Sequence, residues 1–158
     1  MRVLGIDPGT LVCGYGVIDF DGGVMKAVDY GVVRSPRRPL HERLHTIYEG
    51  LTSLIARHRP QVAAIEGVFH GVNPRTALKI GEGRGVALLA AAAAGLQVLE
   101  YPPATVKKAI VGSGRAHKSQ VQQMVRLLLA LPTIPEPQDA ADALAIAICH
   151  CHRLQGAP

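Results

Sequence analysis

The spacing of apolar residues along the chain predicts alternating strands and helices. Apolar-rich segments at residues 2–7, 15–20 and 24–33 are typical of strands, and Asp21-Gly22-Gly23 between the last two predicts a hairpin turn. Between residues 40 and 55 large apolar side chains recur every three or four positions, which predicts an amphipathic helix. The chain therefore opens with three antiparallel strands that a helix follows.

The second half of the chain alternates strands with helices. Its predicted elements are strands at 62–66 and 97–101 and helices over about 73–94, after Pro102-Pro103, around 121–129 and over about 139–153. Because helices separate the later strands, those strands should run parallel to the first. We predict one α/β domain over residues 1–158, with a mixed five-stranded sheet and helices on both faces.

Length and composition fit a globular protein of the cytoplasm. The 158 residues are 48% hydrophobic and 18% charged, which is enough for a buried core. The longest apolar run, residues 86–94, is far too short to span a membrane, and we see no signal segment. An odd and sparse set of three cysteines argues against a disulfide scaffold and for a reducing compartment.

The charge of the chain favours an anionic partner such as nucleic acid. The net charge is +5 and the pI about 9.4. Between residues 71 and 118 seven basic residues face two acidic ones, so this stretch alone carries +5. Solvated helix faces are the alternative explanation of that stretch.

Two further patterns each have two interpretations. The run Cys149-His150-Cys151-His152 suggests zinc, but adjacent helical positions face different directions, so we favour helix packing. Glycines at 81, 83 and 85 interrupt a predicted helix and permit close backbone approach. We interpret them as contacts with a two-fold mate, with close packing onto the chain's own sheet as the alternative.

Four carboxylates fall where a catalytic site is expected. Asp7 and Glu66 each end a strand of the predicted parallel pair, so both should emerge at one edge of the sheet. Asp139 and Asp142 share one face at the start of the last helix. Each acid also has a non-catalytic explanation: Asp7 as a turn residue, Glu66 as an exposed strand end, and Asp139 and Asp142 as partners of the helix dipole. Together they would repel one another unless a divalent cation such as Mg²⁺ or Mn²⁺ joined them.

At this point the sequence resembles the RuvC family of Holliday junction resolvases, over about residues 2–153. The motifs that carry the resemblance are Gly5-Ile6-Asp7-Pro8-Gly9-Thr10, Gly14-Tyr15-Gly16-Val17, Ile65-Glu66-Gly67-Val68-Phe69, Ala77-Leu78-Lys79-Ile80-Gly81, Val106-Lys107, Gly112-Ser113-Gly114, Lys118-Ser119-Gln120-Val121 and Asp139-Ala140-Ala141-Asp142-Ala143-Leu144-Ala145-Ile146-Ala147. The family pattern has Gln where this chain has Gly67, which leaves the preferred cut sequence open.

The resemblance implies an RNase H-like fold and a homodimer that nicks two opposing strands of a four-way DNA junction. It implies that the four carboxylates are catalytic and hold Mg²⁺, with Mn²⁺ able to substitute and two ions in each site. The expected products carry 5′-phosphate and 3′-hydroxyl ends, and the expected partner is the RuvA–RuvB branch-migration complex. Lys107 and Lys118 are expected to contact DNA, and Phe69 to stack on a base.

Basic residues near the predicted site fit a phosphate backbone. Arg75 lies in the first turn of a predicted helix, where its positive charge is unfavourable beside the positive end of the helix dipole. A bound DNA phosphate would offset that repulsion. Around the Gly-rich loop at 112–114 lie Lys107, Lys108, Arg115 and Lys118. Solvated side chains, and a core position for Phe69, are the alternatives. We assign no role to His70 or His117.

Three other functions fit parts of the pattern. The Asp7-Pro8-Gly9-Thr10 turn also resembles the phosphate turn of actin-like ATPases, which need two such domains and about twice this length. A non-catalytic junction-binding protein and an RNase H-like nuclease with another nucleic-acid substrate are the remaining alternatives. A resolvase differs from the junction-binding protein in metal-dependent strand scission. It differs from the other nuclease in the substrate that it cuts.

Overall fold

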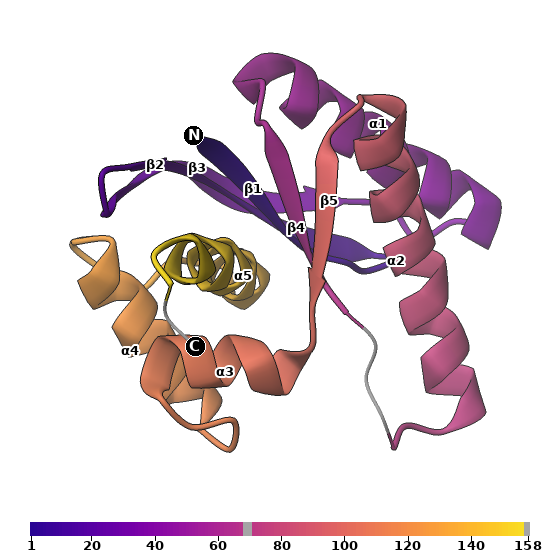
Figure 1. Ribbon diagram of the computed structural model, residues 1–158. Helices are drawn as coiled ribbons and strands as arrows, with labels where there is room; N and C mark the ends of the chain where they lie inside the picture. Colours follow the sequence, from indigo (N-terminus) through magenta and orange to yellow (C-terminus); the bar gives the residue numbers. More distant parts are fainter. Residues whose placement is uncertain (68–70, 157–158) are drawn as a thin grey trace.

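A five-stranded sheet in the order β3-β2-β1-β4-β5 forms the centre of the computed structural model, which describes residues 1–67 and 71–156 (Figure 1). The strands are β1 (Arg2–Asp7), β2 (Val12–Asp21), β3 (Val24–Arg34), β4 (Val62–Glu66) and β5 (Gln97–Tyr101). The first three pair antiparallel, whereas β4 runs parallel to β1 and β5 parallel to β4. The predicted mixed sheet is therefore confirmed.

The hairpin between β2 and β3 turns at the predicted glycines. Gly22 and Gly23 have φ angles of 54° and 89°, which suit a two-residue turn whose twist matches the strands. Strand β2 begins at Val12, three residues earlier than predicted. The reason is that residues 12–14 pair with β3, and Gly14 pairs with β1 as well, although Val12-Cys13-Gly14 gives no clear alternation.

Helices cover both faces of the sheet, as predicted (Figure 1). One face carries α1 (Leu40–His58) and α2 (Pro74–Ala93), and the other carries α3 (Pro103–Val111), α4 (Lys118–Leu128) and α5 (Gln138–Leu154). The α2 boundary follows the predicted capping signal, because the Asn73 side chain accepts a hydrogen bond of 2.9 Å from the Thr76 N–H. Among the described residues, no helix has the length and apolar character of a membrane span.

The middle of the α5 helix is buried between the sheet and the outer helices. Cys149, His150 and Cys151 lie in its buried part, each less than 5% exposed. Among the described residues, the one group of His, Cys, Asp or Glu side chains close enough together to hold a metal ion is Asp7, Asp139 and Asp142. The cysteine and histidine run therefore takes part in the packing of the helix against the core.

Candidate active site

Two parallel strands bring the first pair of predicted carboxylates together. Ile6 of β1 pairs with Ile65 of β4, so Asp7 and Glu66 follow directly at the same edge of the sheet. Each comes after a fully buried apolar residue, and each is itself only partly exposed. The predicted meeting of these two side chains is therefore confirmed.

A seam of glycines lets α5 approach this edge closely. Gly5 and Gly16 are paired across β1 and β2, and Gly14 pairs with Asp7. A Cβ atom at Gly14 would overlap the carbonyl oxygen of Asp139, so only glycine permits this contact. A Cβ at Gly5 would likewise overlap the helix backbone. The seam thus sets how near the first turn of α5 comes to the end of β1.

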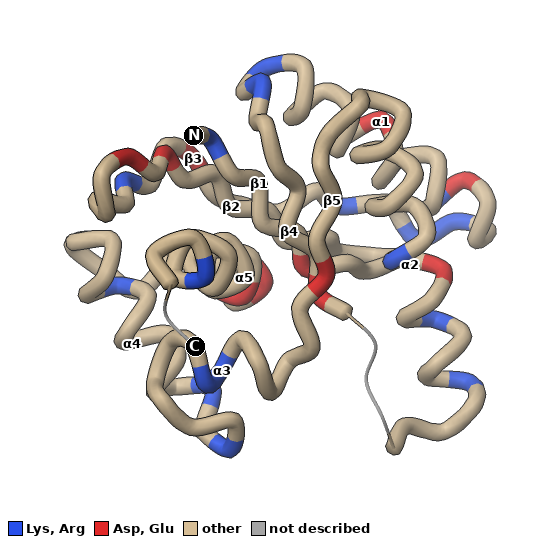
Figure 2. The backbone as a smooth tube through the Cα atoms, viewed as in Figure 1, with Lys and Arg blue, Asp and Glu red and all other residues tan. Residues whose placement is uncertain are grey.

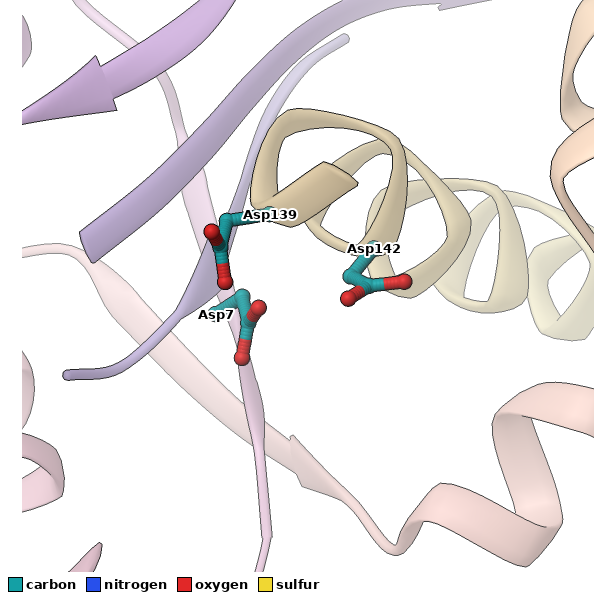
Figure 3. Close-up of side chains that lie close together, drawn as sticks. All are labelled: Asp7, Asp139 and Asp142. Atoms are coloured by element: carbon teal, nitrogen blue, oxygen red, sulfur yellow. The ribbon is translucent and has the colours of Figure 1, made fainter. Parts of the chain in front are cut away.

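Three carboxylates consequently converge on one point (Figure 3). One oxygen from each of Asp7, Asp139 and Asp142 lies within 4.8 Å of the other two. Glu66 interacts with Asp7 from the neighbouring strand. The donors are all hard oxygen atoms from side chains that are partly buried, which is the ligand chemistry of Mg²⁺ or Mn²⁺. The residues present therefore fit a divalent metal ion.

Burial and mutual repulsion disfavour the charged forms of these acids. Burial, with further repulsion from Glu66, Asp142 and Asp139, raises the pKa of Asp7 to about 9. Burial and the charge of Asp142 raise the pKa of Glu66, although Lys118 and Lys107 oppose the shift. A divalent cation would reverse this balance, because it favours the ionised carboxylates.

Two lysines border the acids. The Lys118 Nζ lies 2.8 Å from an Asp142 oxygen. Burial alone would lower the pKa of Lys118, but its hydrogen bond to Asp142 and the nearby negative charge raise it overall. Together with Lys107 and Glu66, this pair lines a hollow of about 230 Å³ between β4, α3, α4 and α5. Both lysines were expected to contact DNA, but the sequence did not predict the ion pair between Lys118 and Asp142.

Three other predicted contact residues, Lys108, Arg115 and Arg75, do not line this hollow. Lys108 and Arg115 are exposed on α3 and on the loop after it. Arg75 is exposed in the first turn of α2. Phe69 and His70 lie outside the described residues. His117 caps α4, where its backbone N–H donates to the Gln120 side chain at 2.8 Å.

The sequence analysis did not identify the glycine seam as part of the site. Gly14 and Gly16 occupy alternate positions of one strand, so they lie on the same face, and Gly5 stands opposite Gly16. That spacing was the available signal, together with the alanines of α5. Glycine contributes no apolar side chain to a hydrophobic pattern, so its role becomes visible only when the helix that covers it is known.

Comparison with known proteins identifies the family. Residues 3–150 match the family model described as Crossover junction endodeoxyribonuclease RuvC. The chain is 56% identical to a protein of that name from Heliobacterium modesticaldum, over 98% of this chain and 96% of the relative. It is 55% identical to one from Chloroflexus aggregans, over 96% of this chain and 93% of the relative.

Solved structures agree with the sequence relatives. The Thermus thermophilus RuvC structure is 38% identical with a TM-score of 0.88, covering 99% of this chain and 98% of that one. The same protein in complex with a Holliday junction substrate is 36% identical with a TM-score of 0.87, covering the same shares of both chains. The fold and its acidic edge define an RNase H-like, metal-dependent nuclease. The chain belongs to the RuvC family of crossover junction endodeoxyribonucleases.

Proposed function

We propose that the chain resolves four-way DNA junctions by nicking two opposing strands, leaving 5′-phosphate and 3′-hydroxyl ends. The observation that carries the proposal is the convergence of Asp7, Asp139 and Asp142 at an edge that basic side chains border. The relatives' names and the Thermus thermophilus junction complex support the substrate. In this function residues 1–158 would act as one nuclease domain, in the cytoplasm.

The proposed metal ligands are Asp7, Glu66, Asp139 and Asp142, and Mg²⁺ is the expected ion, with Mn²⁺ able to substitute. We propose two ions in each site, which when bound supply an activated water and stabilise the leaving oxygen of the phosphodiester. The chain's own contribution is to hold the carboxylates in place before the substrate arrives. The parallel strand ends and the glycine seam do this, because they fix the backbone from which the acids project.

The basic residues around the acids would hold the scissile strand. Lys107 and Lys118 line the hollow beside Glu66 and are the proposed phosphate contacts nearest to the site. The proposed outer contacts are Arg75, Lys108 and Arg115, with Phe69 stacking on a base near the centre of the junction. Cations at these places offset the repulsion between the acids and DNA, so the strand can approach the carboxylates.

Cutting two strands symmetrically requires two sites, and α2 offers a surface for a homodimer. Leu78, Gly81, Gly85 and Leu89 share one face of the helix, at offsets of 0, 3, 7 and 11. The two leucines are 65% and 59% exposed, and nothing lies within 4 Å of a Cβ built at Gly81 or Gly85. Gly83 instead contacts Gly9 of its own chain. The RuvA–RuvB complex is the proposed functional partner.

A cleavage assay on a synthetic mobile junction tests this function. Each strand is labelled in turn, and the junction and a linear duplex are incubated with Mg²⁺ or with EDTA. We expect paired, symmetric nicks on the junction only, and only with Mg²⁺. Asp7→Asn should abolish nicking while junction binding persists, whereas the exposed Asp21→Asn should cut like the parent protein.

The alternatives give different results in the same assay. Binding without nicks, on several junction sequences and with Mn²⁺ as well, would identify a non-catalytic junction-binding protein. Cleavage of the duplex or of RNA would assign the chain to another substrate within the RNase H-like nucleases. Loss of junction affinity in a folded Asp7→Asn protein would contradict a purely catalytic role for that residue.

A further inference from the structure

A second basic surface lies apart from Lys107 and Lys118, where β3 meets α1. We call it the arginine patch; its members are Arg34, Arg37, Arg38 and Arg43. These four cations fall within ten residues, against the single acid Glu42. Its only ion pair among the described residues joins Arg38 and Glu42 at 3.3 Å, with the two side chains 63% and 42% exposed. Such an exposed pair neutralises little of the charge.

The loop that carries the patch is held in place before any ligand binds. Pro36 and Pro39 each fix one backbone angle of the loop. Ser35 donates its backbone N–H to the Leu11 carbonyl at 2.9 Å and its hydroxyl to the Thr10 carbonyl at 3.1 Å. A surface ordered in this way loses less conformational entropy when it binds a charged partner.

The patch adjoins the segment that directly follows the catalytic candidate Asp7. Arg43 donates a hydrogen bond of 3.0 Å to the Thr10 hydroxyl, three residues after Asp7. With Leu11, the arginines Arg37, Arg38 and Arg43 line an open hollow of about 500 Å³. Figure 2 shows basic segments on both sides of the acidic centre, along α3 on one side and where α1 begins on the other.

We propose that the arginine patch binds the sugar-phosphate backbone of DNA, on the side of the acids away from Lys107 and Lys118. The inference rests on the proposed function, and it extends the DNA contact to a surface that the sequence did not suggest. Arginine suits this role because its planar guanidinium can hold two phosphate oxygens at once. A strand lying across the acids would then have cations at both ends of its path.

An acidic protein surface is the other class of ligand that such a patch could attract. The position next to Thr10 favours DNA, since a protein seated there would crowd the strand that must reach Asp7. The net positive charge of the chain adds long-range attraction for a polyanion. The test below therefore uses DNA alone as the probe.

The test is the salt dependence of DNA binding by the double variant Arg37→Gln, Arg38→Gln. Fluorescence anisotropy on a labelled four-way junction in EDTA gives the Kd at several salt concentrations without cleavage. We expect the slope of log affinity against log salt to fall by about two, and affinity at about 0.1 M salt to weaken by roughly tenfold or more. Both side chains are exposed, so the thermal midpoint should hardly change.

The matched control is Arg57→Gln, Arg59→Gln, which removes the same charge at the opposite end of α1. That end lies about 28 Å away along a 19-residue helix. Its slope should equal that of the parent protein. An unchanged slope in the patch variant, or an equal change in the control, would overturn the proposal. An unchanged slope would leave an acidic protein as the ligand class. The measurement does not depend on nicking, so a negative result would count against the arginine patch and not against the proposed function.

Discussion

Asp7 shows how a single residue can depend on a cation. Its carboxyl group is partly buried at the end of β1, facing three other acids, and this environment raises its pKa to about 9 from an ordinary value near 3.8. The neutral form is thus the favoured form in the metal-free protein. A metal ion and a proton therefore compete for the Asp7 carboxylate, so binding of the ion releases the proton.

The raised pKa of Asp7 predicts how the stability of the metal-free protein changes with pH. Between about pH 4 and pH 9 the unfolded chain has released a proton that the folded protein keeps, so stability falls as the pH rises, by up to about 1.4 kcal/mol per pH unit for one proton. Asp7→Asn removes this loss. In EDTA, we expect its thermal midpoint to exceed that of the parent protein by more at about pH 8 than at about pH 5.

With Mg²⁺ bound, the thermal midpoint of the parent protein should exceed that of Asp7→Asn. The parent protein gains stability from the bound ion, and Asp7→Asn gains less because one ligand has lost its charge. Asp21→Asn serves as the control, since its side chain is exposed on the hairpin and should change neither profile. Midpoints of Asp7→Asn that run parallel to those of the parent protein across the pH range would contradict this account.

Lys118 also acts on the acids themselves, and its effect on Asp142 is larger than that of Lys107. Its hydrogen bond and charge oppose the rise that burial imposes on the pKa of Asp142. Lys118→Ala should therefore raise the pKa of Asp142 further and move the pH–rate profile of Mg²⁺-dependent cleavage towards higher pH. The salt slope of DNA binding should also fall by about one. Single-turnover rates measured across pH provide the check.

Lys108→Ala is the comparison for Lys118. The Lys108 side chain is exposed on the same helix as Lys107, and it makes no ion pair among the described residues. We expect this variant to leave the pH–rate profile in place. If Lys118→Ala gives the same profile as Lys108→Ala, then Lys118 contributes to DNA binding alone.

At the scale of whole elements, the glycine seam decides where the acids of α5 lie. Gly14→Ala would push a Cβ atom into the Asp139 carbonyl oxygen, and backbone cannot move aside as a side chain can. We expect a loss of about 2 kcal/mol or more in the free energy of unfolding, together with slow or absent nicking. Chemical denaturation and the junction assay measure these two effects.

Gly67→Ala provides a matched control at the same edge of the sheet. A Cβ there would meet Tyr101 and Pro102 at 3.4 Å, an ordinary packing distance, and the residue follows Glu66 directly. Its stability should stay close to that of the parent protein. If Gly14→Ala is as stable as the parent protein, then α5 can shift without loss of stability. That result would contradict the role given to the glycine seam.

The sequence predicted elements well where hydrophobic spacing is strong. The strands β1, β4 and β5, the amphipathic α1 and the hairpin glycines all follow from local pattern and turn chemistry. Two features escaped it because they depend on what approaches from elsewhere in the fold. Gly14 carries no pattern of its own until α5 covers it, and the ion pair between Lys118 and Asp142 joins two helices.

The four acids were predictable as a group for a different reason. Asp7 and Glu66 end parallel strands, and topology alone brings such ends together. Asp139 and Asp142 needed the position of α5, which hydrophobic spacing does not give. The family resemblance supplied that link, and the structure explains it physically through the small residues beneath the helix.

At the scale of the whole molecule, exposed leucines mark the surface by which two copies would meet. Leu89 on α2 and Leu127 on α4 are both 59% exposed, but only Leu89 lies in a stripe with Leu78 and two open glycines. Paired nicking needs two sites held in a fixed relation, so this stripe would link the fold to the symmetry of the reaction.

The variant Leu89→Asp tests that link, with Leu127→Asp as its matched control. Burying a charge at a two-fold contact is costly, so Leu89→Asp should shift the protein from about twice the chain mass of 16.7 kDa towards that mass in sedimentation velocity. Its nicks on the junction should become single and uncorrelated. Leu127→Asp should stay dimeric and cut in pairs. A dimeric Leu89→Asp protein would place the two-fold contact on another surface.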